Sequence, residues 1–121
     1  ADAYAAADIV VVPSLTETFP LAVLDGLAWE KAIVATRVGG IPEIITDRMN
    51  GLLVPPGDSR TLSRVLLELV EDGDLRRRLA AQSRTVDFDR FSWERVLQRY
   101  ERICEDLLQT EERPRLRVET S

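Results

Sequence analysis

Two carboxylates lie around one predicted strand-to-helix junction. Glu17 stands in a loop just ahead of a predicted helix, and Asp25 follows eight residues later, inside that helix. A carboxylate in the loop can accept hydrogen bonds from sugar hydroxyls, and one further into the helix can reach a second part of the same ligand. Backbone amides at the helix start, around Phe19, Leu21 and Ala22, favour an anion such as a pyrophosphate, because the helix dipole places partial positive charge there.

The same residues have a simpler interpretation. Glu17 or Thr16 would cap the helix, and Asp25 would be a solvated surface acid, since two carboxylates eight residues apart occur by chance in many helices. Pro20 itself donates nothing, because it has no backbone N–H. Spacing alone leaves both interpretations open.

A second candidate is the run Gly39-Gly40-Ile41-Pro42-Glu43. It predicts a flexible turn that leads into a helix start, whose amides would face the same cleft. The alternative is a tight turn with Glu43 placed favourably near a helix N-terminus.

The composition excludes several kinds of chemistry. The 121 residues contain no histidine and one cysteine, Cys104, which removes an internal disulfide, a zinc site and a histidine general base. Metal chemistry could rest only on carboxylates. A net charge of −5 argues against nucleic acid as a partner, because 21 acidic residues outnumber 16 basic ones.

The elements that must position the candidate residues alternate between strands and helices. Apolar runs predict strands at Ile9–Val12, Ala32–Thr36 and Leu52–Val54, the first as a central strand covered on both faces. A short alanine-rich helix precedes them. Pro20 and Pro42 sit at helix starts. The first of these helices has apolar residues at helical spacing: Leu21, Leu24, Leu27 and Ala28. Ile44 and Ile45 form the buried face of the second, and Asn50-Gly51 predicts the turn before the third strand.

The second half of the chain is predicted to be helical. Asp58 or Ser59 caps a helix that Gly73 ends, and a second helix spans roughly Asp74 to Arg84. The last begins near Ser92. The first and last have apolar stripes, which are Leu62, Val65, Leu66 and Leu69, and Trp93, Val96, Leu97, Tyr100, Ile103 and Leu107. Residues from about Thr110 are charged and aperiodic, which predicts a frayed tail over 110–121.

This order predicts the α/β class, with a parallel sheet, right-handed crossovers and flanking helices. Three strands are few for a parallel sheet, and two exposed edges indicate that strands are missing upstream. We therefore expect the domain to be truncated at its N-terminus.

Taken in order, these segments resemble the C-terminal domain of the glycosyltransferase 4 family (glycosyl transferases group 1), from about Ala3 to Leu108. The ordered set is specific, although each piece alone is common. The matching motifs are Ala7-Asp8, Pro13-Ser14, Glu17, Phe19-Pro20-Leu21, the Glu17 to Asp25 spacing, Gly39-Gly40-Ile41-Pro42-Glu43, Asn50-Gly51-Leu52-Leu53-Val54-Pro55-Pro56-Gly57-Asp58 and Phe91-Ser92-Trp93.

The resemblance implies the Rossmann-like, donor-binding half of a GT-B enzyme over residues 1–109. Such an enzyme moves a sugar from a nucleotide-diphosphate sugar to an acceptor, keeps the anomeric configuration and needs neither a metal nor another cofactor. Glu17 would be the catalytic residue that contacts the donor sugar, and Asp25 would hold the ribose. The donor site would also include Thr18, Phe19, Pro20, Leu21, Gly39 and Gly40. Backbone amides around Phe19 to Leu21 would hold the sugar and diphosphate.

Three residues depart from the family pattern. Asp25 replaces a glutamate, Glu30 a glycine and Ala32 a proline. The family's basic pair, which clamps the diphosphate, would lie upstream of this sequence, and Arg37 near the end of the second strand would be its local substitute.

We therefore expect the chain alone to be inactive. Its partners would be the nucleotide-sugar donor and a missing N-terminal acceptor domain, through which any peripheral membrane contact would be made. Exposed edges and helix faces predict a homo-oligomer, and the absence of a secretory signal predicts the cytoplasm. Alternatives are a non-catalytic nucleotide-sugar-binding or subunit-interaction domain, and a GT-B sugar-nucleotide epimerase, to which the Phe19-Pro20 loop is less similar.

Overall fold

The computed structural model describes residues 2–109 and divides the chain into two compact units, Ala1–Val86 and Asp87–Ser121. The boundary falls inside the range for which the sequence predicts a single domain, and the predicted division into residues 1–109 and a tail stays a prediction. The tail itself, residues 110–121, lies outside the described residues.

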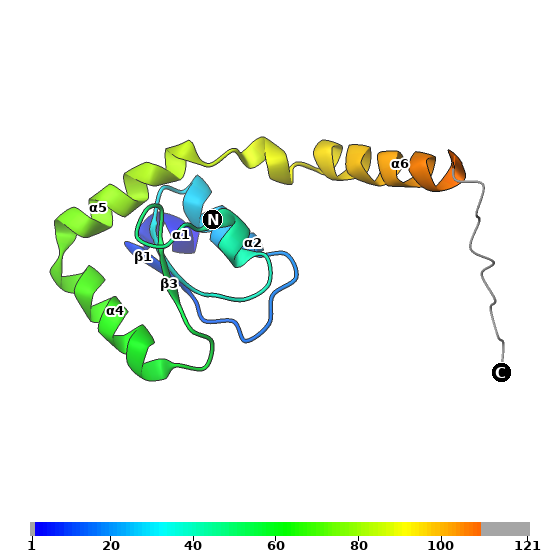
Figure 1. Cartoon of the computed structure of the whole chain (residues 1–121). Coiled ribbons are helices and arrows are strands. Elements are labelled where there is room, and N and C mark those ends of the chain that lie inside the picture. Colours follow the sequence, from blue (N-terminus) through cyan, green and yellow to red (C-terminus); the bar gives the residue numbers. More distant parts are fainter. Residues whose placement is uncertain (1, 110–121) are drawn as a thin grey trace. The chain divides into compact units, whose positions relative to one another are not determined.

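The first unit alternates strands and helices (Figure 1). The strands form one parallel sheet in the order β1-β2-β3, with Ile9 opposite Ala32 and Val34 opposite Leu52. The α/β class is therefore confirmed. Its elements are α1 (Asp2–Ala6), β1 (Ile9–Val12), α2 (Leu21–Ala28), β2 (Ala32–Thr36), α3 (Ile41–Ile44), β3 (Leu52–Val54), α4 (Ser59–Glu71), α5 (Gly73–Gln82) and the 3₁₀ turn η1 (Ser83–Thr85).

The central strand of the described sheet is β2 rather than β1. All five residues of β2 are buried, whereas Val11 in β1 is 38% exposed. The prediction that Ile9–Val12 is central was wrong for this sheet, because a β-branched run indicates a strand but does not say how many neighbours it has. Within residues 2–109, β1 pairs on one side only, with β2.

Helices cover both faces of the sheet, with α2 on one side and α4 and α5 on the other (Figure 1). On the α2 side, a Cβ at Gly26 would lie 3.1 Å from Ile33, so the glycine permits close helix–strand packing. The stripe of α2 that is buried consists of Val23, Gly26 and Leu27. Leu21 and Ala28, predicted on the apolar stripe, are exposed.

The opposite face holds an apolar core cluster, built from residues of β2, β3, α4 and α5. Its buried members are Val34, Leu52, Val54, Val65, Leu69, Leu75 and Leu79, with Ile9, Leu62 and Leu66 packed against them. The predicted stripe of α4 is thus confirmed. Leu69 and Leu79 are fully buried, so this cluster anchors α4 and α5 to the sheet.

Gly73 begins α5 and does not end α4, contrary to the prediction. Asp72 separates the two helices, and its side-chain oxygen accepts a hydrogen bond from the Leu75 N–H at 2.9 Å. Because an N-cap aspartate starts a new helix at once, the glycine that follows it lies in the first turn.

The turn before β3 is built around a buried amide. The Asn50 side chain accepts from the Thr46 N–H at 2.8 Å and donates to the Ile44 carbonyl at 2.9 Å. These bonds close the segment that follows α3 and confirm the turn predicted at Asn50-Gly51.

Two residues other than glycine adopt positive φ, Glu30 at 53° and Arg48 at 63°. Each side chain forms a two-point pair with a distant residue, Glu30 with Arg84 and Arg48 with Glu68. The resemblance implies a glycine at the position of Glu30, and a glycine would adopt this left-handed backbone without strain.

The second unit contains the 3₁₀ turn η2 (Phe88–Phe91) and α6 (Trp93–Gln109). The Ser92 hydroxyl accepts a hydrogen bond from the Arg95 N–H at 3.3 Å and so caps α6. No residue of α6 is buried in the described structure. Its predicted apolar face is therefore not buried by any other described residue of the second unit.

Across residues 2–109, no helix combines the length and apolarity that crossing a membrane requires.

Candidate functional site

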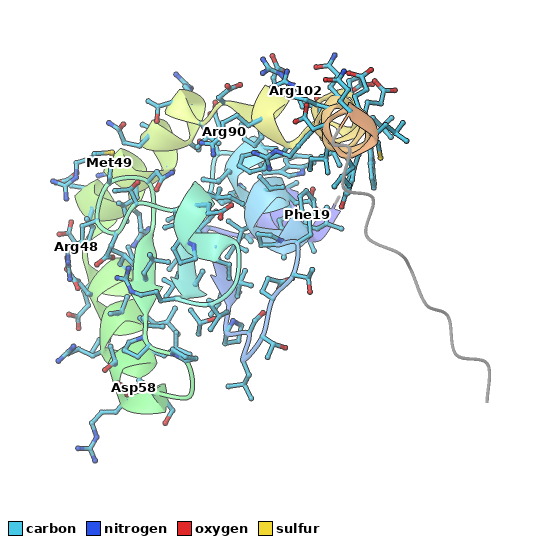
Figure 2. All side chains as sticks on the ribbon, turned by 45° about the vertical axis from the view of Figure 1, so that its right-hand side comes forward. Phe19, Arg48, Met49, Asp58, Arg90 and Arg102 are labelled. Carbon is cyan, nitrogen blue, oxygen red and sulfur yellow. The ribbon has the colours of Figure 1, made fainter. Side chains whose placement is uncertain are left out.

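The carboxyl ends of the three parallel strands meet at one edge of the sheet, where ligands collect in open α/β folds. A hollow of about 190 Å³ lies there, and Asp58, which borders it, stands at the start of α4 in Figure 2. The residues that line it lie at or just after the ends of the three strands and at the start of α4. They are Pro13, Leu15, Thr36, Val54, Pro55, Gly57, Asp58, Ser59 and Leu62. Hydrogen bonds from the Thr61 hydroxyl at 2.6 Å and its N–H at 3.0 Å lower the pKa of Asp58.

Glu17 is half-buried in the loop between β1 and α2. The Ser14 hydroxyl donates a hydrogen bond to the Glu17 carboxylate at 3.2 Å. Ser14 is held in turn by Thr36, whose hydroxyl donates to the Ser14 carbonyl at 2.6 Å. Two hydrogen bonds therefore connect the end of β2 to the predicted catalytic carboxylate.

The two loops singled out in the sequence meet in the structure. Gly39 has a φ of 52°, and a Cβ built on it would lie 1.7 Å from the Glu17 carbonyl oxygen. A Cβ on Gly40 would lie 3.6 Å from Pro20 and from the Thr18 carbonyl oxygen. The Gly39-Gly40 turn therefore packs directly against the Glu17 loop, although neither Glu17 nor the two glycines line the hollow at the ends of the strands.

The start of α2 differs in part from the prediction. Pro20 occupies the N-cap, and its φ of −83° and ψ of 70° are close to those of the central residue of an inverse γ-turn. The hydrogen bond of this turn runs from the Leu21 N–H to the Phe19 carbonyl at 2.9 Å. The Leu21 amide is therefore already paired, and the expectation that it is free was wrong. The N–H groups of Phe19 and Ala22 have no partner within the described residues.

No side chain caps α2, so the simpler interpretation of Glu17 or Thr16 as its cap is not what the structure shows. The Phe19 side chain is exposed beside this helix start (Figure 2). Asp25 lies on the exposed side of α2, one turn after Leu21. This exposure is what the simpler interpretation of Asp25, a solvated surface acid, predicts, and its role toward a ligand stays a prediction.

The remaining predicted groups lie elsewhere. Glu43 is in the first turn of α3. The Arg37 guanidinium lies 4.0 Å from the Asp47 carboxylate and is more than half exposed, so its geometry gives no support to a role as phosphate clamp. In the described part of the chain, no three histidine, cysteine or acidic side chains gather as metal ligands would.

Sequence reasoning missed Thr36 and the residues after β3. Thr36 is 3% exposed and its hydroxyl contacts the Glu17 loop, but within an apolar run it resembles any other strand-forming residue. A usable signal was available, because residues just after neighbouring parallel strands share one sheet edge. Applied to Thr36 and Pro55, that rule would have located the hollow.

A larger hollow of about 440 Å³ belongs to the second unit. It is lined mainly by exposed arginines and includes no residue of the predicted donor site: Arg90, Arg95, Val96, Gln98, Arg99, Tyr100 and Arg102.

Known proteins similar to this chain are glycosyltransferases. A glycosyltransferase of Methanocaldococcus jannaschii is 36% identical over 98 residues, which is 81% of this chain and 28% of that protein. The solved C-terminal domain of LpcC, a glycosyl transferase group 1 family protein from Francisella tularensis, is 41% identical with a TM-score of 0.62, covering 66% of this chain and 41% of that one. HepE of Anabaena, solved in complex with UDP-glucose, is 25% identical with a TM-score of 0.73, covering 87% of this chain and 29% of HepE.

The chain thus spans well under half the length of these relatives, and its resemblance to a C-terminal domain agrees with the fold. Residues 1–72, more than half of the sequence, match the family described as glycosyl transferases group 1. The chain belongs to the glycosyl transferases group 1 family.

Proposed function

We propose that this chain is the donor-binding segment of a retaining, metal-independent glycosyltransferase of the cytoplasm. It would bind a nucleotide-diphosphate sugar whose sugar passes to an acceptor held elsewhere. The observation that carries the proposal is the direct packing of Gly39 against the backbone of Glu17, at the carboxyl ends of the strands. The UDP and UDP-glucose complexes of HepE support this ligand class.

Each group at the proposed site has a distinct task. Glu17 would accept hydrogen bonds from hydroxyls of the donor sugar, while the N–H groups of Phe19 and Ala22 would contact the diphosphate at the positive end of α2. Asp25, one methylene shorter than the family's glutamate, would bind the ribose hydroxyls. Charge that develops on the departing diphosphate would be stabilised by amide dipoles and by positive groups outside this sequence.

We further propose that the chain alone does not turn over. It covers 28% of the Methanocaldococcus glycosyltransferase, and transfer requires an acceptor site as well as a donor site. In the absence of a basic clamp, donor affinity of the 121-residue chain should be weaker than about 1 μM.

A titration followed by amide NMR tests the donor site directly. UDP-glucose, GDP-mannose and ADP-glucose are added separately to the chain, and one of them is expected to shift the signals of Glu17, Phe19, Ala22 and Gly39. The control is an Asp74→Asn variant, altered on the exposed start of α5, which should show the same donor-induced shifts as the unaltered chain. Shifts confined to another surface, or none at millimolar donor, would contradict the assignment.

The roles of the two carboxylates separate in an enzyme completed with its acceptor-binding half. Glu17→Gln should lower kcat more than Asp25→Asn, because charge develops on the transferred donor sugar and not on the ribose of the nucleotide. Asp25→Asn should mainly raise the donor KM, by roughly tenfold for one hydrogen bond to a charged group. The reverse pattern in steady-state kinetics would exchange the two assignments.

A further inference from the structure

The hydrogen bonds between β2 and the Glu17 loop carry an inference that rests on the proposed function. Thr36 is the last residue of β2, and its side chain is 3% exposed. Its hydroxyl has one hydrogen to donate, and the 2.6 Å distance to the Ser14 carbonyl is much shorter than the 3.4 Å distance to that of Val12. The main bond of this hydroxyl therefore holds Ser14.

Ser14 passes this constraint on to Glu17. Its backbone is fixed by Thr36, and its hydroxyl donates to the Glu17 carboxylate at 3.2 Å. Holding the Ser14 backbone fixes the position of its Cβ, and rotation of the side chain then places the hydroxyl against Glu17. The buried bond from Thr36 thus sets the point from which the donor to Glu17 is presented.

The backbone of Glu17 is restrained from a second direction. Gly39 approaches the Glu17 carbonyl so closely that no Cβ fits between them. The peptide is therefore backed by the glycine turn, while the side chain is held by Ser14. Glu17 is thus restrained at its backbone by the glycine turn and at its carboxylate by Ser14, which favours one orientation toward the hydroxyls of a ligand.

We propose that Thr36 is a positioning residue for Glu17, acting through Ser14, and that this pair sets the recognition of the donor sugar rather than of the nucleotide. Thr36 lines the hollow at the ends of the strands, and in this arrangement it acts on the donor sugar through Ser14 and Glu17. Its loss should weaken the contribution of the sugar to binding and leave the contribution of the nucleoside diphosphate nearly unchanged.

The test compares the nucleotide sugar that binds with its free nucleoside diphosphate, here written for UDP-glucose and UDP, since the ratio of their dissociation constants isolates the sugar. Thr36→Val removes the hydroxyl at similar shape, Thr36→Ser retains it, and Ser14→Ala removes the second bond. Thr85→Val is the matched control, because the Thr85 hydroxyl also bonds a backbone carbonyl, that of Gln82 at 2.7 Å, on the exposed η1 turn.

Thr36→Val and Ser14→Ala should each reduce the preference for UDP-glucose over UDP by about fivefold, with UDP affinity changed less than about twofold. Thr36→Ser and Thr85→Val should leave that preference intact. In the absence of ligand, the NMR signal of the Glu17 carboxyl carbon should move in Thr36→Val and Ser14→Ala and stay in the other two variants.

A Thr36→Val protein that melts at a lower temperature but keeps both the Glu17 signal and the sugar preference would overturn the proposal and leave Thr36 a purely structural residue. Failure of the proposed function gives a different result. Glu17→Gln would then leave the sugar preference unchanged, or none of the three nucleotide sugars would bind, and the Glu17 signal in the ligand-free variants would still decide the role of Thr36.

Discussion

The helices α4 and α6 have similar amphipathic sequences and opposite surroundings. Leu69 of α4 is completely buried in the core cluster, while Tyr100 of α6 is 63% exposed. Other apolar residues of the α6 stripe are also exposed. An apolar stripe shows that a helix has a face to bury, but it contains no information about what buries it. The chain supplies that partner for α4 and, within the described second unit, does not supply it for α6.

The difference follows from what precedes each helix. The segment Pro55–Asp58 joins β3 to α4, and Asp58 caps the helix, so α4 returns along the sheet as the crossovers of α/β folds do. The segment before α6 is a 3₁₀ turn, and residues 87–109 of the same unit include no strand. Our expectation of a partner for this stripe, in a second copy or in another domain, stays a prediction.

The largest expected effect is a core deletion in α4. Leu69→Ala should lower the free energy of unfolding by about 2–5 kcal/mol, because a fully buried leucine leaves a cavity in the cluster. Ile103→Ala, its counterpart on α6, should change it by less than about 0.5 kcal/mol. Urea unfolding followed by circular dichroism measures both, and equal losses would mean that the stripe of α6 is buried in solution.

An intermediate effect is expected at the helix caps. Asp72→Ala removes the acceptor of the Leu75 N–H and should cost about 1 kcal/mol in the unfolding of the first unit. Ser92→Ala removes the corresponding cap of α6 and should reduce helical signal without moving the midpoint of that transition. A shift of the midpoint by Ser92→Ala would show that the two units unfold together.

The smallest effect concerns pH. The Arg48 guanidinium, at 3.0 Å, lowers the pKa of Glu68, so this ionised carboxylate favours the folded state above its unfolded pKa of about 4.3. That contribution is lost as pH falls through the lower folded pKa. Since the two side chains are 59% and 38% exposed, screening limits it to about 0.5 kcal/mol.

Glu68→Gln should therefore reduce stability at pH 7 and have little effect at pH 3. Glu101→Gln, an exposed change on α6, should have little effect at either pH. Urea midpoints at the two pH values provide the comparison, and an equal loss from Glu68→Gln at pH 3 would rule out the ion pair as its cause.

The sequence predicted those parts of the fold that depend on local signals. β2 and β3 match the predicted ranges residue for residue, because each is an apolar run ended by residues that favour turns. The position of β1 at the edge of the described sheet could not be predicted, since neighbours depend on tertiary contacts.

The site divides in the same way. The Glu17 loop and the Gly39-Gly40 turn were predicted to face one cleft, and the structure brings these two segments into contact. The loss of the Leu21 amide to a turn depends on the ψ angle of Pro20, which proline leaves free, and so it could not be foreseen from residue types. The bond from Thr36 links residues 22 positions apart and needed the sheet register to be known.

The close approach at Gly39 also has an evolutionary consequence. Every codon change that replaces a glycine adds a Cβ, and at position 39 that atom would collide with the Glu17 carbonyl, so neutral drift is closed to this residue for as long as the loop keeps its path. Gly57 also has positive φ, 72°, but a Cβ there would meet nothing within 4 Å. Asparagine or aspartate, which tolerate the left-handed region, are therefore open to lineages at position 57. Gly39 and Gly57 both have positive φ, but only position 57 is free to vary among related sequences, because the neighbouring Glu17 carbonyl prevents substitution at position 39.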